Sequence, residues 1–100
     1  MQFIITAYDG TDPDALTRRM SVRPRHLEGI ARVKEEGHVI CAGGILDDEG
    51  QMKGSFLIME YASREELDNY LEKEPYVTGN VWQDIRIESC NVVIQGGPGK

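Results

Sequence analysis

Cysteine and histidine are scarce in this sequence, which contains two of each among its 100 residues. Cys41 and Cys90 lie far apart along the chain, so they predict neither a disulfide framework nor a set of closely spaced metal ligands. We expect two reduced, packed thiols of the kind found in cytoplasmic proteins. A single disulfide between them stays open as an alternative, because separation along the chain does not fix distance in space.

Long apolar runs are absent too, since no stretch approaches the roughly 20 residues of a membrane-spanning helix. The apolar segment at residues 1–8 is short and has no basic residues before it, unlike a signal peptide. Basic residues number 11 against 17 acidic ones, which gives a net charge of −6. This balance disfavours binding to nucleic acid or to anionic lipid. We therefore expect a cytoplasmic protein whose partners include neither nucleic acid nor membrane.

The residues that are present have the composition of one globular domain, with 40% hydrophobic and 28% charged residues. A chain of 100 residues is long enough for a single modest core. We predict this domain over residues 1–95 and a flexible C-terminal tail over residues 96–100, where glycine is frequent.

Four segments rich in apolar and β-branched residues predict strands, at residues 2–8, 38–46, 54–61 and 82–94. Apolar residues at helical spacing lie between the first and second of these segments, and again between the third and fourth. In the later helical region Ser63 and Glu66 form a capping box, and Pro75 ends the helix near Glu74. Residues 76–80 then form a short connection.

The earlier helical region contains Pro24, which would cost about 3 kcal/mol in a helix interior. We therefore predict two helices with a break at Ser21. Asp12 caps the first of them and Ser21 caps the second, so that Pro24 falls in a first turn, where a missing N–H matters little. Gly37 ends the second helix.

The element order is thus β-α-β-β-α-β, which is the ferredoxin-like arrangement of an α+β fold with an antiparallel four-stranded sheet. In this arrangement the first and third strands are central. Both strands have apolar residues on both faces. In the first strand Phe3 points to one face and Ile4 to the other, and in the third strand Leu57 and Ile58 alternate in the same way. Two helices cover only one face of such a sheet, so we expect a second copy of the chain to cover the other, giving a homodimer that packs through its sheet faces.

Six of the 11 basic residues lie between positions 18 and 34, and this local positive charge in an acidic chain suits a small anionic molecule. For most of them we favour ion pairs with neighbouring glutamates on a solvated surface. Arg19 and Arg23 lie at the predicted helix break beside His26, and we predict that they bind the anionic group. Ser21 is expected to add a hydrogen bond.

His26 is the best candidate for moving a proton, because an imidazole exchanges protons near neutral pH. A lone histidine on a helix is more often structural or exposed, so the prediction needs a partner. Glu74 supplies one, since both helices of this topology lie on the same sheet face and a carboxylate would fix the tautomer of the ring. Tyr76 and Trp82 are expected to pack in the core and to close a pocket wall.

The segment Met20–Leu27, MSVRPRHL, resembles the LSVRPxHL motif of the YciI-like (YCII-related) proteins. The similarity covers nearly the whole chain and returns at Glu74–Val77, where the family usually has Asp-Pro-Tyr or Asp-Pro-Phe. The resemblance implies a ferredoxin-like domain that pairs into a dimeric α/β barrel. It also implies a His–Asp active-site pair, in which His26 matches the histidine and Glu74 matches the aspartate with one more methylene. One branch of the family is similar to dechlorinating enzymes that act on hydroxylated aromatic compounds.

These observations together predict a small enzyme of the lyase or isomerase type that needs no cofactor and no metal. Its substrate would be a small anionic molecule, cyclic or phenolic. His26 would move the proton and Glu74 would orient the ring. Elimination or isomerisation fits better than hydrolysis, because the sequence offers no activated serine or cysteine nucleophile. The alternative is a non-catalytic module that binds a small ligand or serves only for dimerisation.

Overall fold

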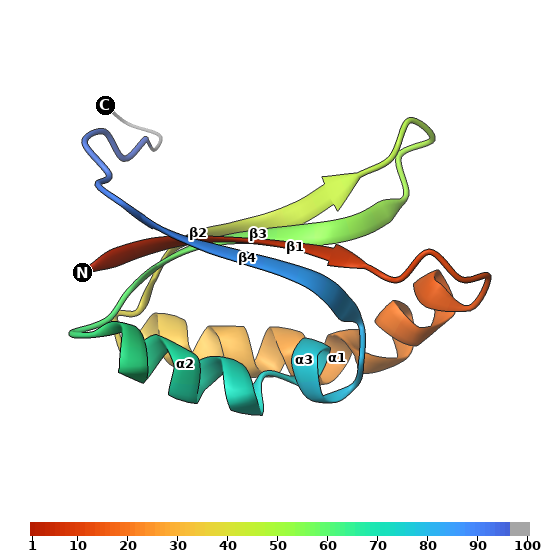
Figure 1. Ribbon diagram of the computed structural model, residues 1–100, viewed down its shortest axis with the longest axis horizontal. Helices are drawn as coiled ribbons and strands as arrows, with labels where there is room; N and C mark the ends of the chain where they lie inside the picture. Colours follow the sequence, from red (N-terminus) through yellow and green to blue (C-terminus); the bar gives the residue numbers. More distant parts are fainter. Residues whose placement is uncertain (97–100) are drawn as a thin grey trace.

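Residues 2–9 form a central strand of the sheet, one residue longer than the strand that the apolar and β-branched residues 2–8 predict (Figure 1). The computed structural model describes residues 1–96, so residues 97–100 of the predicted tail lie outside the described part. The elements are β1 Gln2–Asp9, α1 Ala15–Glu35, β2 Val39–Leu46, β3 Met52–Glu60, α2 Arg64–Lys73, α3 Pro75–Thr78 and β4 Trp82–Cys90. The sheet has the order β2-β3-β1-β4 and every neighbouring pair is antiparallel. The predicted ferredoxin-like fold and its two central strands are confirmed.

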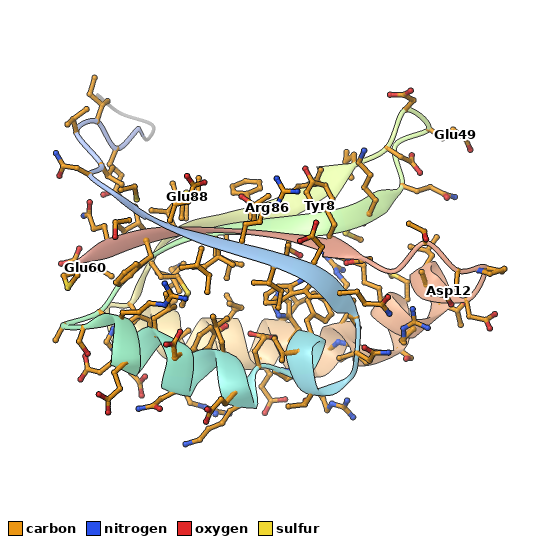
Figure 2. The ribbon with its side chains drawn as sticks, viewed as in Figure 1. Tyr8, Asp12, Glu49, Glu60, Arg86 and Glu88 are labelled. Atoms are coloured by element: carbon orange, nitrogen blue, oxygen red, sulfur yellow. The ribbon has the colours of Figure 1, made fainter. Side chains whose placement is uncertain are left out.

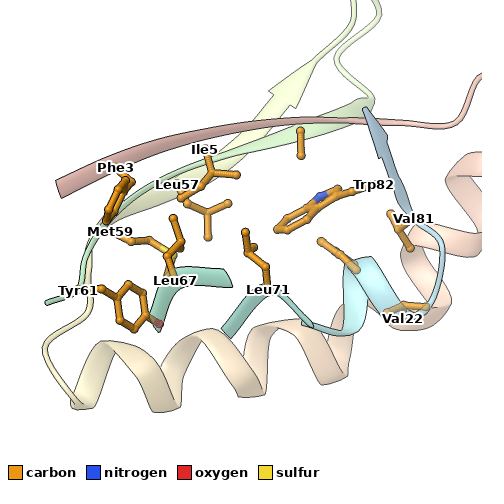
Figure 3. Close-up of a cluster of buried hydrophobic side chains, with 12 residues drawn as sticks. Phe3, Ile5, Val22, Leu57, Met59, Tyr61, Leu67, Leu71, Val81 and Trp82 are labelled. Atoms are coloured by element: carbon orange, nitrogen blue, oxygen red, sulfur yellow. The ribbon is translucent and has the colours of Figure 1, made fainter. Parts of the chain in front are cut away.

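One face of the sheet carries the core. Phe3 and Ile5 of β1 lie beside Met59 and Leu57 of β3 in the register of the two strands, and all four side chains are buried. Figure 3 shows these side chains meeting Leu67 and its neighbours from the helix layer. Since α1, α2 and α3 all lie on this side (Figure 1), the core fills the space between one sheet face and the helices.

The other face of the sheet has no helix over it within residues 1–96 (Figure 1). Figure 2 shows Tyr8, Arg86 and Glu88 standing on this side. Ile4 and Ile58, which pair across β1 and β3, are only partly buried here, and Phe56 is 36% exposed. The central strands therefore present apolar side chains on a face that residues 1–96 leave open.

The predicted break at Ser21 is wrong, because α1 continues through Pro24 as one helix. Proline removes one helical hydrogen bond, but the helix brings Arg19, Val22 and His26 onto one buried stripe, and a break would separate them. The burial of that stripe outweighs the local cost of Pro24.

The start of α1 also differs from the prediction. The helix begins at Ala15 with Asp14 as its N-cap residue, not Asp12. The Asp12 side chain is instead engaged outside the helix, where it accepts hydrogen bonds from Arg18 at 2.7 Å and from the Asp14 backbone N–H at 3.3 Å.

The ends of α2 follow the sequence signals. Ser63 accepts a hydrogen bond from the Glu66 backbone N–H at 3.2 Å, and the Glu66 carboxylate accepts one from the Ala62 N–H at 3.0 Å. The connection predicted over residues 76–80 is wrong in part, because Pro75–Thr78 form the short helix α3. Its first turn is supported by Pro75 at the N-terminal position and by the Glu74 side chain, which accepts from the Tyr76 N–H.

Both cysteines are free thiols, but Cys41 is exposed, so the prediction of two packed thiols is wrong for that residue. Cys41 lies on β2 and Cys90 on β4, at the two opposite edges of the sheet. Three strand spacings separate these edges, or about 14 Å, which is too far for a disulfide within one chain. No helix within residues 1–96 has the length and apolarity of a membrane span.

A buried ion pair fastens α1 to the sheet. Arg19 donates from Nη1 to both carboxylate oxygens of Asp9 on β1, at 2.9 and 3.0 Å, and both side chains are almost fully buried. Its Nη2 donates to Ser55 Oγ on β3 at 2.8 Å, and Trp82 Nε1 donates to the same oxygen at 3.1 Å. Burial raises the pKa of the Asp9 carboxyl and the Arg19 guanidinium opposes that rise. One guanidinium thus joins α1 to the strands β1 and β3.

We expect Arg19→Met to lower the free energy of unfolding by about 3–5 kcal/mol, because it leaves the Asp9 carboxylate buried without its partner. The matched control is Arg18→Met, which breaks the ion pair with Asp12 in solvent and should cost far less. Urea denaturation of the two variants at neutral pH measures both effects. Equal losses in the two variants would contradict the role given to the buried pair.

The buried phenol of Tyr61 should make the stability of the fold depend on alkaline pH. The Tyr61 side chain is buried, its hydroxyl has no hydrogen-bond partner within residues 1–96, and burial raises the pKa of Tyr61 to about 12. An unfolded chain loses this proton near pH 10, so the stability that the protonated phenol contributes is complete below pH 10 and is lost as the pH rises towards 12. Tyr61→Phe should therefore leave stability at pH 7 unchanged or higher, and flatten its alkaline decline.

Chemical denaturation of wild type and Tyr61→Phe at pH 7, 10 and 11.5 provides the measurement. An equally steep alkaline decline in both proteins would show that the Tyr61 phenol does not contribute to it.

Candidate functional site

The face of α1 that meets the sheet carries Arg19, Arg23 and His26, spaced by four and three residues. These side chains line a cavity of about 250 Å³ between the helix and the strands β2 and β3. Gly43, Ser55 and other residues of the two strands form its floor, and Tyr76 closes one side. The wall formed by Tyr76 agrees with the prediction for that residue. The continuous course of α1 through Pro24 is what brings His26 to this cavity together with Arg19.

The contact predicted between His26 and Glu74 is present, although 48 positions separate the residues. His26 Nδ1 lies 2.6 Å from Glu74 Oε1, and the side chains are 11% and 0% exposed. Glu74 reaches this place because it lies where α2 ends and α3 begins. The turn at Pro75 aims its side chain into the helix layer.

Two further donors hold the Glu74 carboxylate. The Tyr76 backbone N–H donates to Oε1 at 3.1 Å, and the Tyr70 hydroxyl donates to Oε2 in a short hydrogen bond. Burial and the Glu74 charge raise the pKa of Tyr70, so that hydroxyl keeps its proton and remains a donor. A carboxylate with this set of donors is satisfied in its charged form.

The hydrogen bonds of Glu74 determine the tautomer of the His26 imidazole. An ionised carboxylate only accepts hydrogen bonds, so Nδ1 carries the proton and Nε2 of the neutral ring keeps its lone pair. The ring is stacked on Tyr76 with centroids 3.9 Å apart and planes at 10°, and Trp82 meets it edge-on at 5.8 Å. These contacts fix the ring, so the arrangement can take a proton from a molecule in the cavity through Nε2 and stabilise the resulting positive charge through Glu74.

The two predicted anion-binding arginines differ in their surroundings. Arg19 is occupied by Asp9 and Ser55, as described above, and its guanidinium is 4.8 Å from the centre of the Tyr76 ring. Arg23 is half-buried, lines the same cavity, and has no ion pair or hydrogen bond to another side chain within residues 1–96. Arg23 is therefore the cation available to a ligand.

Ser21 is not brought to the cavity. Its side chain is exposed, and its hydroxyl donates to the Arg18 backbone carbonyl at 2.9 Å. The structure thus gathers four of the five predicted site residues, Arg19, Arg23, His26 and Glu74, and places Ser21 on the outer side of α1.

Sequence reasoning missed two residues of this neighbourhood. Tyr70 lies one helical turn before Glu74, and this spacing is a signal that could have paired them. Ser55 carried no signal, because a serine in an apolar strand is recognised as a buried acceptor only when its partners, Arg19 and Trp82, are known.

A second cavity, of about 610 Å³, lies between α1 and α2. Tyr61, Tyr70 and Glu74 line it, together with basic and acidic side chains of both helices. Glu74 therefore lines the larger cavity and is bound to His26, which lines only the smaller one. Within residues 1–96 no three His, Cys, Asp or Glu side chains gather as ligands for a metal ion.

Comparison with known proteins gives this site a context. Residues 1–91 match the YCII-related domain. Over 94 residues the chain is 31% identical to protein YciI of Escherichia coli O6:H1, a match that covers 88% of this chain and 94% of that protein.

Solved structures that resemble the fold include two that are compared below. One is 5-chloro-2-hydroxyhydroquinone dehydrochlorinase (TftG) from Burkholderia phenoliruptrix AC1100 in complex with 2,5-dihydroxybenzoquinone, with a TM-score of 0.79, 27% identity, and coverage of 91% of this chain and 94% of that one. The other, an antibiotic biosynthesis monooxygenase, shares the fold alone, with a TM-score of 0.55, 17% identity, and coverage of 93% and 98%. The resemblance found in the MSVRPRHL segment is thereby confirmed, and the chain belongs to the YCII-related family.

Proposed function

We propose that this protein is a lyase that eliminates a small group, such as HCl, from a hydroxylated ring by acid–base chemistry. The observation that carries the proposal is His26, whose Nδ1 is bound to the buried carboxylate of Glu74 while the ring lines the smaller cavity. The similarity to a dehydrochlorinase supports the type of reaction and the class of substrate. A cavity of about 250 Å³ is large enough for one substituted six-membered ring.

The proposed chemistry is redox-neutral overall. For a chlorinated trihydroxybenzene, two phenolic O–H bonds break and two carbonyls form. One of the two protons is placed on the ring carbon that carries chlorine, and the other leaves with chloride as HCl. His26 Nε2 takes a phenolic proton and the resulting imidazolium returns it, so one residue serves as base and then as acid. No external oxidant enters this balance, so the proposal requires no cofactor.

The surrounding residues have separate tasks in this proposal. Glu74 keeps the proton on Nδ1 and stabilises the imidazolium between the two transfers. Arg23 binds an anionic oxygen of the ring, since its guanidinium is the one on the cavity wall with no partner among residues 1–96. Arg19 acts on the site by holding α1 against the sheet.

We also propose that two copies of the chain pair through the uncovered sheet face. The apolar side chains of Ile4, Phe56 and Ile58 lie there with no helix of residues 1–96 over them. A two-fold axis would pack two such faces against each other and remove this apolar surface from water. We place the protein in the cytoplasm, where the thiols of Cys41 and Cys90 would stay reduced.

The enzyme proposal predicts that His26→Ala lowers kcat for HCl release from 5-chloro-2-hydroxyhydroquinone by roughly 10²–10⁴-fold. Chloride release gives the rate, and isothermal titration with 2,5-dihydroxybenzoquinone gives binding. Glu74→Gln should also slow turnover, because an amide can offer Nδ1 an N–H and reverse the tautomer. The control is His38→Ala, since His38 lies at the other cavity, where its ring contacts the Glu60 backbone carbonyl.

Unchanged turnover in His26→Ala would refute the catalytic role. Wild-type protein that binds the quinone but releases no chloride would instead favour the alternative function, a module that only binds a small ligand.

The pairing proposal predicts twice the single-chain mass of 11.2 kDa in sedimentation equilibrium at micromolar concentration. Ile58→Lys should shift the mass to that of one chain, because it places a charge on the uncovered sheet face, which the pairing would bury. Val93→Lys is the matched control, since Val93 is 80% exposed and follows the last strand. A wild-type mass of one chain would overturn the proposal.

A further inference from the structure

Tyr76 has an unusual hydroxyl. The side chain is 1% exposed, yet the hydroxyl oxygen has no hydrogen-bond partner within residues 1–96. Buried polar side-chain atoms in folded proteins nearly always have a partner. His26 is stacked on the Tyr76 ring and the Arg19 guanidinium lies over it, so these contacts involve the ring and not the hydroxyl.

The position of this hydroxyl is fixed. The Tyr76 ring is stacked on His26, with Trp82 edge-on at 5.4 Å. The backbone N–H of Tyr76 is bound by Glu74, so both the main chain and the ring are held. A group that is held in this way offers its hydrogen bond in one direction without first having to be ordered.

The Tyr76 side chain is part of the wall of the cavity that His26 lines. Arg23 lines the same cavity. Burial raises the pKa of Tyr76, and the positive charges of Arg19 and Arg23 oppose that rise. The phenol therefore stays protonated at neutral pH and remains a hydrogen-bond donor, close to the unpaired guanidinium of Arg23.

We propose that Tyr76 is a substrate-binding residue whose hydroxyl donates a hydrogen bond to an anionic oxygen of the ligand, while Arg23 neutralises the charge of that oxygen. This inference rests on the proposed function and narrows its substrate class. The ligand would be a single ring with two oxygen functions: one ionised, held by Tyr76 and Arg23, and one that exchanges a proton with His26. A ring with only one oxygen would satisfy one side of the cavity and leave the other unpaired.

The test is a titration of wild type, Tyr76→Phe and Tyr61→Phe with 2,5-dihydroxybenzoquinone. Tyr76→Phe keeps the aromatic ring that stacks on His26 and removes only the donor, so its Kd should rise by roughly 10–100-fold, the usual effect of losing a hydrogen bond to a charged group. Tyr61→Phe is the matched control, because it removes another buried, unpartnered hydroxyl that lines the larger cavity and not that of His26. Its Kd should stay within twofold of wild type.

A second measurement uses the unaltered protein and therefore does not depend on how the variants fold. With tyrosine labelled by ¹³C at Cζ, the Tyr76 resonance should shift when the quinone is added, and the Tyr61 resonance should stay in place. Equal affinity of wild type and Tyr76→Phe, or a Tyr76 resonance that does not move, overturns this inference and leaves the lyase proposal standing. If wild type binds the quinone but releases no chloride, and Tyr76→Phe binds the quinone more weakly, the inference is supported and the lyase proposal is overturned. A wild type that does not bind the quinone overturns the inference.

Discussion

The carboxylate of Glu74 is the group on which the rest of the helix layer depends. A buried charge is stable only when donors surround it, and here each donor comes from a different helix: His26 from α1, Tyr70 from α2 and the Tyr76 N–H from α3. The same three contacts hold the helices together and set the orientation of the imidazole. Packing and the candidate chemistry therefore share one set of hydrogen bonds, and a change at Glu74 affects both.

Two arginines one helical turn apart illustrate how burial divides roles on α1. Arg19 faces the strands, where Asp9 and Ser55 take up its donors and the pair fastens the helix to the sheet. Arg23 faces the cavity with its guanidinium unpaired within residues 1–96. Composition alone makes them equivalent, but only the second has charge left for a ligand. Under the proposed function, this separation keeps anion binding at Arg23 from competing with the stability of the fold.

Much of this arrangement could be predicted from the sequence. The strand order and the meeting of His26 with Glu74 follow from apolar periodicity, from the signal at Ser63, and from the two helices lying on one face. The course of α1 could not be predicted, because local rules weigh Pro24 without the buried stripe that offsets it. The partner of Arg19 could not be predicted either. Asp9 follows the alternation of β1 onto the core face, but an aspartate directly before a glycine is typical of a turn.

The length of the acidic side chain at position 74 has an evolutionary consequence. Its two oxygens reach donors on different helices, Tyr70 on one side and His26 on the other. A lineage that shortened this acid by one carbon would draw the carboxylate back towards its own backbone, and the phenol one turn earlier would lose its acceptor. The two positions should therefore covary among descendants, with a donor at position 70 retained where the longer acid is found and free to drift where it is not.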